Sequence, residues 1–191
     1  HSKRQDTHII NLEKTVEGIE RALPVIEKVV KDGKKILFVG TKKQLKAIVK
    51  EVAESVEMPY VTERWVGGTL TNVETVNRQI KKLKDLERRM KSGELEARYS
   101  KLEVQRFQEE IETLNIRYGG IKEMTDQPSL VIVTDACEDK NAIKEAKTLN
   151  IPVIAICGSL KDDLPDFPVA GISAAFPIIG QVADLDQVLA A

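Results

Sequence analysis

The most unusual stretch of the sequence is RWVGGTLTN at residues 64–72. It places Arg64 beside Trp65, the only tryptophan of the chain, and follows them with a glycine pair and short polar side chains. A guanidinium and an indole can stack on bases, and glycines let backbone N–H groups approach a ligand closely. The stretch therefore indicates RNA contact. Two structural roles stay open beside it: Trp65 fills the core, and Thr71 caps a following helix in a capping box with Glu74.

A second candidate site is GTKK at residues 40–43, where a predicted buried strand ends and a helix begins. Free backbone N–H groups and the helix dipole attract anions at such a point, and Lys42 and Lys43 add positive charge. The sequence lacks the GxxxxGK[ST] and GxGxxG patterns of nucleotide-binding loops. A nucleotide phosphate, an RNA phosphate and a solvated turn are the alternatives for this site.

Groups that could catalyse a reaction are few. His1 and His8 are the only histidines, and neither has a Ser or Cys partner at a known catalytic spacing. Asp135 and Asp139 follow a predicted strand, where doubly wound enzymes place catalytic carboxylates, but such aspartates more often cap the next helix. We therefore predict a protein that is not an enzyme, without cofactor, metal or small-molecule substrate. A nucleotide-binding enzyme that uses residues 40–43 and Asp135 is the alternative.

The composition excludes several classes of protein. With 42% hydrophobic residues, the 191-residue chain can bury the core of one ordinary domain. Lys and Arg number 29 against 30 Asp and Glu, so the total charge does not by itself indicate a nucleic-acid partner. The two cysteines lack CxxC spacing, which favours a reducing compartment. No apolar run approaches the roughly 20 residues that cross a bilayer, so we predict a soluble, intracellular protein with no membrane partner.

Buried strands and amphipathic helices alternate along most of the chain. Short apolar runs predict strands buried on both faces, and apolar residues three or four apart predict helices. The predicted order is a helix at 11–32, a strand at 34–41, a helix near 45–56, strands at 60–62 and 129–135, a helix at 140–149, a strand at 152–158 and a last helix at 183–190. This alternation is typical of a parallel sheet with helices on both faces, so we predict a doubly wound α/β fold.

Residues 73–118 break this alternation. They are rich in Lys, Arg, Glu and Gln, and their apolar side chains, Leu102 among them, recur at spacings near three and four. We predict two helices that are joined near residues 92–94 and fold back on each other as an antiparallel coiled-coil hairpin. The first limb is mainly basic and the second mainly acidic, so the limbs attract each other. The predicted division is an α/β domain at 8–72 and 119–191, with the hairpin at 73–118 inserted into it.

Several longer motifs follow the order and spacing of a known family. They are HIINLEKT at 8–15, FVGTKKQ at 38–44, PYV at 59–61, RWVGGTLTN at 64–72, YGGIKEM at 118–124, KEA at 144–146 and IPVIA at 151–155. Across residues 8–157 the chain closely resembles the bacterial-type ribosomal protein S2 family of the small ribosomal subunit. It departs from the family at residues 158–160, where GSL replaces the usual Asp-x-Asn, so polar contacts there are not carried over.

The resemblance implies a flavodoxin-like fold with an inserted coiled-coil hairpin. It implies a structural protein of a cytoplasmic or organellar ribosome, which binds small-subunit ribosomal RNA, contacts neighbouring ribosomal proteins and helps to dock ribosomal protein S1. It implies no catalysis. A hairpin that only docks a protein is a further alternative. The predicted RNA-binding residues are Lys42, Lys43, Arg64, Trp65, Gly67, Gly68, Thr71, Asn72, Arg78, Lys81, Lys82 and Arg88.

Overall fold

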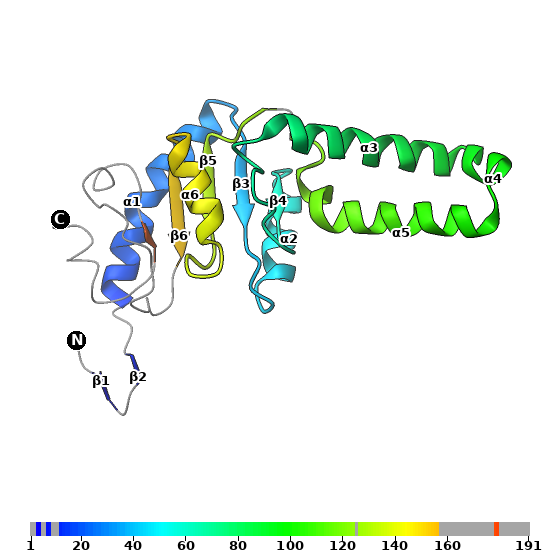
Figure 1. Cartoon of the computed structure of the whole chain (residues 1–191). Coiled ribbons are helices and arrows are strands. Elements are labelled where there is room, and N and C mark those ends of the chain that lie inside the picture. Colours follow the sequence, from blue (N-terminus) through cyan, green and yellow to red (C-terminus); the bar gives the residue numbers. More distant parts are fainter. Residues whose placement is uncertain (1–2, 5–6, 9–11, 125, 157–177, 180–191) are drawn as a thin grey trace.

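The chain folds around a parallel β-sheet (Figure 1). The computed structural model describes residues 3–4, 7–8, 12–124, 126–156 and 178–179. Five strands lie in the order β4-β3-β5-β6-β7, each parallel to its neighbour. They are β3 (Ile36–Val39), β4 (Tyr60–Val61), β5 (Leu130–Val133), β6 (Val153–Ile156) and β7 (Ile178–Ile179), and a separate antiparallel pair is formed by β1 (Lys3–Arg4) and β2 (Thr7–His8).

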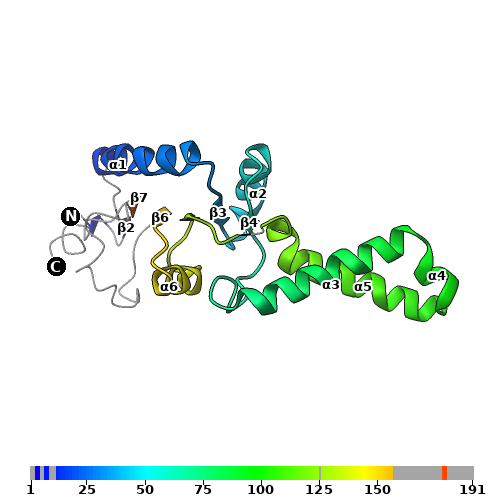
Figure 2. The ribbon, with the colours of Figure 1, turned by 90° about the horizontal axis from the view of Figure 1, so that it is seen from above.

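Helices cover both faces of this sheet (Figure 2). α1 (Leu12–Lys31) and α2 (Lys46–Ser55) lie over one face. α6 (Lys140–Thr148) lies over the other face, together with the start of α3 (Val73–Lys91). The predicted doubly wound α/β fold is therefore confirmed. The helix predicted at 183–190 and the departure from the family at 158–160 lie outside the described residues.

Strand side chains alternate between two apolar layers. Leu37 and Val39 pack on the side of α3 and α6, whereas Ile36 packs with Ala22 and Val29 of α1. Continuous apolar runs such as residues 36–39 are expected in a parallel sheet that is covered on both faces. No helix in the described part of the chain is long and apolar enough to span a membrane.

Two long helices, α3 and α5 (Lys101–Tyr118), extend side by side beyond the sheet (Figures 1 and 2). A short helix, α4 (Glu94–Arg98), connects them at the far end. The two long helices share an apolar seam, because both bury side chains that belong to the same core cluster. The buried residues are Val76, Ile80, Leu83 and Leu86 of α3 and Leu114 and Tyr118 of α5. The coiled-coil character and the division into two domains stay predictions.

The second long helix begins later than its predicted start. Tyr99 is extended, and Ser100 starts α5 with a capping box: its hydroxyl accepts from the Glu103 N–H at 3.4 Å, and its N–H donates to Glu103 Oε2 at 2.9 Å. The prediction that Leu102 belongs to the seam is wrong, because that side chain is 61% exposed. Leu102 lies five residues before Phe107, which turns it about 140° around the helix from the buried stripe.

We expect Gly120→Ala to lower the free energy of unfolding by about 1–3 kcal/mol in a urea titration. Gly120 belongs to the 3-10 turn Gly119–Ile121, and a Cβ there would overlap the Tyr60 carbonyl oxygen and lie 2.7 Å from two ring carbons of Tyr60. The matched control is Gly67→Ala, because a Cβ on Gly67 meets nothing within 4 Å, and its effect should stay within about 0.5 kcal/mol. Equal stabilities would contradict this packing.

Candidate nucleic-acid interface

One carboxylate, that of Glu145 on α6, holds the loop that joins β4 to α3. Its Oε1 accepts hydrogen bonds from Trp65 Nε1 at 2.9 Å and from the Gly68 N–H at 2.8 Å. Its Oε2 accepts from the Leu70 N–H at 3.0 Å and from both the N–H and the hydroxyl of Thr71 at 3.3 Å. Figure 2 shows the loop passing beside α6 before α3 begins. The loop is therefore closed around an internal anion.

This arrangement decides between contact with RNA and packing in the core, the two roles considered for Trp65. The indole is only 8% exposed and belongs to the core cluster that links the sheet to α3, α5 and α6. Protein atoms therefore cover the faces of the ring, and in this structure they are not available for the predicted stacking on bases. Gly68 has a φ of +89°, a backbone conformation that is strained for residues with a side chain. Its N–H already donates a hydrogen bond to Glu145.

The cap of α3 lies one residue later than predicted. Asn72, rather than Thr71, is the N-cap residue, and its side-chain oxygen accepts a hydrogen bond from the Thr75 N–H at 3.4 Å. The hydroxyl of Thr71 is instead held by Glu145. The Thr71 hydroxyl and the side-chain oxygen of Asn72, both predicted to meet RNA, therefore have internal partners.

The hydrogen bonds to Glu145 also set its acidity. Burial alone would raise the pKa of this carboxyl, but the donors of Trp65, Gly68, Leu70 and Thr71 lower it, and the net result is a pKa below the ordinary value. The carboxylate is charged at neutral pH, which is the state that all of these donors require.

The turn at residues 40–43 is closed in the same way. The N–H and hydroxyl of Thr41 donate to Asp139 at 3.2 and 2.8 Å, and Lys42 Nζ lies 2.8 Å from Asp135 Oδ2. α2 begins at Lys46, close to its predicted start near residue 45, and the turn at residues 40–43 lies before its first residue. The protein's own carboxylates thus accept from the donors that a phosphate would use. Of the two lysines in this turn, Lys43 is the one that is exposed and has no ion pair with a described residue.

The two aspartates have opposite environments. Burial raises the pKa of Asp139, which is 1% exposed, whereas for Asp135 the hydrogen bond from Lys42 and the Glu138 and Cys137 N–H groups outweigh burial and lower the pKa. Asp139 is the N-cap residue of α6, but its side chain bonds Thr41 instead of capping the helix, so the predicted capping role is wrong. The described residues contain no group of three acidic, His or Cys side chains that could hold a metal.

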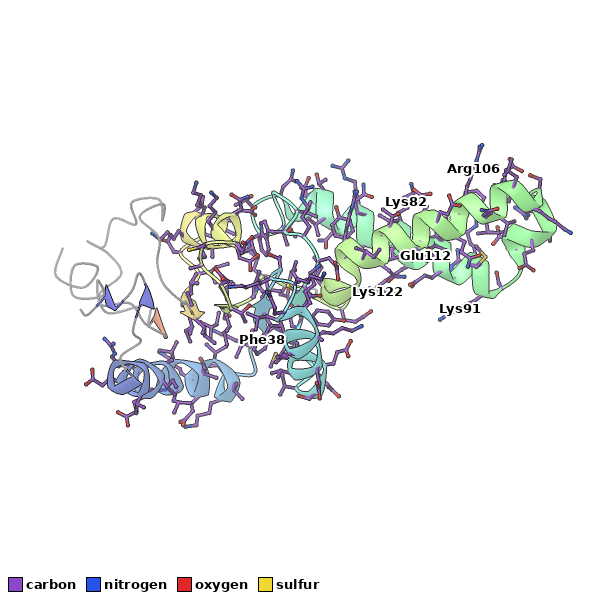
Figure 3. All side chains as sticks on the ribbon, turned by 90° about the horizontal axis from the view of Figure 1, so that it is seen from below. Phe38, Lys82, Lys91, Arg106, Glu112 and Lys122 are labelled. Carbon is purple, nitrogen blue, oxygen red and sulfur yellow. The ribbon has the colours of Figure 1, made fainter. Side chains whose placement is uncertain are left out.

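The exposed face of α3 carries cations in two different states. Lys82 pairs with Glu110 of α5, and Arg88 pairs with Asp85 on its own helix. Arg78 and Lys81 are exposed and form no ion pair with any described residue, although Arg78 donates to the Thr75 hydroxyl at 3.1 Å. Figure 3 shows Lys82 and Arg106 extending from one side of the helix pair and Lys91 from the other.

The structure thus divides the predicted RNA-binding residues into three groups. The cations that are exposed and form no ion pair with a described residue are Lys43, Arg64, Arg78 and Lys81. The cations that are paired with carboxylates are Lys42, Lys82 and Arg88. The loop residues that build the site from inside or line it are Trp65, Gly67, Gly68, Thr71 and Asn72.

Sequence reasoning missed the role of Glu145. The signal was an acidic residue between Ala142, Ile143 and Ala146, which form the buried face of α6. A carboxylate beside an apolar stripe indicates that hydrogen-bond donors of another segment of the protein bind it, but the sequence does not show which segment supplies these donors.

Comparisons with known proteins agree on one family. The model of the family Ribosomal protein S2 matches residues 1–176. The chain is 42% identical over 175 residues to the small ribosomal subunit protein uS2 of Amoebophilus asiaticus, covering 90% of this chain and 55% of that protein. It is 39% identical to the uS2 of Borrelia duttonii and 38% identical to that of Borreliella burgdorferi, each over 171 residues, covering 89% of this chain and 67% and 65% of those proteins. The chain therefore spans between about half and two thirds of the length of these relatives.

We expect the fluorescence of Trp65 to stay constant from pH 7 down to the ordinary Glu pKa of 4.5 and to shift to longer wavelength only at lower pH. A carboxyl whose pKa is lowered by folding stabilises the folded state above its unfolded pKa, and this contribution is lost as pH falls through the folded pKa. Circular dichroism on the same samples separates loop opening from general unfolding. In Glu145→Gln the transition should be absent, and a wild-type shift complete above pH 5 would contradict the assignment.

Proposed function

The chain belongs to the ribosomal protein S2 family, and we propose that it is a structural constituent of the small ribosomal subunit that binds ribosomal RNA. Its place of action is then the ribosome, and its partners are small-subunit RNA and neighbouring ribosomal proteins. The proposed partners include ribosomal protein S1, on the strength of the family resemblance. The relatives carry the name of a ribosomal protein rather than of an enzyme.

The observation that carries the proposal is the set of unpaired cations beside the loop held by Glu145. Arg64 lies in this loop, and Arg78 and Lys81 lie on the second and third turns of the helix that follows it. Each such cation can neutralise one phosphate and release a condensed counterion. Cations already paired with carboxylates contribute less to RNA affinity, because a phosphate must replace an existing partner.

The proposed interaction reads backbone phosphates rather than bases. Trp65 is buried, and the N–H groups of residues 68–72 have internal partners, so the charged groups of Arg64, Arg78 and Lys81 are the main exposed groups left for RNA. Phosphate contacts of this kind fix position and orientation without sequence information. Specificity for one region of the ribosome then comes from the shape of the folded RNA.

The alternative of a nucleotide-binding enzyme would need a phosphate site at residues 40–43. The donors of Thr41 and Lys42 at the carboxyl edge of the sheet are held by Asp139 and Asp135. A nucleotide phosphate there would face two carboxylates.

Reversing two unpaired charges near the start of α3, in Arg78→Glu with Lys81→Glu, should weaken binding to a small-subunit RNA transcript at least tenfold at low salt. It should also reduce the slope of log affinity against log salt by about 2, since two phosphate contacts are lost. Filter binding across a salt series measures both quantities.

The matched control for this variant is Lys28→Glu with Lys34→Glu, which changes the net charge by the same amount at exposed positions on and after α1. Its affinity should stay within about threefold of the wild type, because only long-range charge is altered. Equal losses in the two double variants would mean that RNA is attracted by total charge alone, and no loss in either would leave the hairpin as a protein-docking element.

Two neighbouring lysines give a second, finer test. Lys81→Ala removes an unpaired cation, whereas Lys82→Ala removes one that is already neutralised by Glu110. We expect Lys81→Ala to weaken RNA binding about three- to tenfold and to lower the salt slope by about 1, and Lys82→Ala to change either quantity much less. The reverse order would contradict the proposed division between free and paired cations.

A further inference from the structure

We propose that Glu145 is the positioning residue of the RNA-binding surface: its carboxylate presets the loop at residues 64–72 and thereby the direction in which α3 presents its cations. This inference rests on the proposed RNA-binding function. It concerns an acidic side chain that touches no RNA and acts only through the residues that it holds.

Five donors converge on the two oxygens of this one carboxylate, and they come from both halves of the loop. Oε1 fixes Trp65 and Gly68, and Oε2 fixes Leu70 and Thr71. The loop's own bonds are short-range: the Thr69 N–H donates to the Val66 carbonyl at 3.1 Å, and the Asn72 N–H to the Gly68 carbonyl at 2.7 Å. These local turns shape the loop, whereas its hydrogen bonds to α6 within the described part of the chain all go to Glu145.

The position of Thr71 makes this anchor matter for the cations. Thr71 directly precedes Asn72, the cap of α3, so fixing Thr71 fixes the start of the helix that carries Arg78 and Lys81. At the other end of the loop, Trp65 follows Arg64 directly and is held by Oε1. Cations on both sides of the loop are thus oriented by the same carboxylate.

Glu145 and the loop depend on each other. No Lys or Arg in the described part of the chain forms an ion pair with Glu145, so the partly buried negative charge is compensated by N–H and O–H dipoles alone. A partly buried carboxylate is costly without such donors, and these donors are costly without an acceptor. The loop is therefore preorganised before RNA arrives, and binding does not have to order it.

An amide at this position cannot replace the carboxylate. Glutamine has nearly the same shape, but it offers one acceptor oxygen and an NH2 group that would face N–H donors. Glu145→Gln should therefore release one half of the loop, either the pair bound to Oε1 or the set bound to Oε2. Glu145→Asp keeps the charge on a shorter side chain and should retain part of the arrangement.

Trp65 allows the loop to be observed without RNA, because it is the only tryptophan of the chain and donates directly to Glu145. In the full chain, Glu145→Gln and Glu145→Ala should increase the acrylamide quenching constant of Trp65 at least twofold and weaken binding to small-subunit RNA about tenfold. Glu145→Asp should fall between these variants and the wild type. Sodium acetate should restore low quenching in Glu145→Ala, whereas sodium chloride at the same ionic strength should not.

The control for a general loss of stability is Val29→Ala, a core truncation on the opposite face of the sheet. It should lower the melting temperature without changing Trp65 quenching, and its RNA affinity should stay within twofold of the wild type. RNA affinity in Glu145→Gln that equals the wild type, or a loss no larger than in Val29→Ala, would overturn the positioning role. If the wild type itself does not bind RNA, the proposed function fails, and the quenching data still show whether Glu145 holds the loop.

Discussion

The hydrogen bonds from five donors to the Glu145 carboxylate are the interaction on which the candidate interface depends. They join a helix on one face of the sheet to the loop that begins the α3–α5 pair. Without them the loop would present unsatisfied N–H groups beside the core, each costing about 1–3 kcal/mol when buried. The carboxylate therefore connects the packing of the sheet to the direction of the long helices and to the cations that they carry.

The same device occurs a second time at the carboxyl edge of the sheet. There Asp139, almost fully buried, holds the N–H and the hydroxyl of Thr41, while Asp135 holds Lys42. In both places carboxylates bind loop groups inside the protein, while Lys43, Arg64, Arg78 and Lys81 stay exposed without an ion pair among the described residues. A net charge of −1 is therefore compatible with unpaired cations on the surface, because some of the carboxylates act inside the protein.

The sequence predicted the fold because its signals are local. Buried strands such as residues 36–39 are continuous apolar runs, and their alternation with helices leaves few topologies. Leu102 was misplaced because periodicity does not show that Ser100 starts a new helix with a new phase. Contacts between distant segments were out of reach: nothing near Trp65 says that its indole N–H meets a carboxylate 80 residues later. The family motifs were recognisable from the sequence, but only the structure separates unpaired Lys81 from paired Lys82.

Lysine acetylation of the full chain, free and bound to small-subunit RNA, with each site quantified by mass spectrometry, shows directly which lysines contact RNA. If the unpaired cations bind phosphates, RNA protects Lys81 and Lys43, while Lys28 and Lys34 stay as reactive as in the free protein. Full reactivity of Lys81 in the bound state, with protection concentrated on α1, would contradict it.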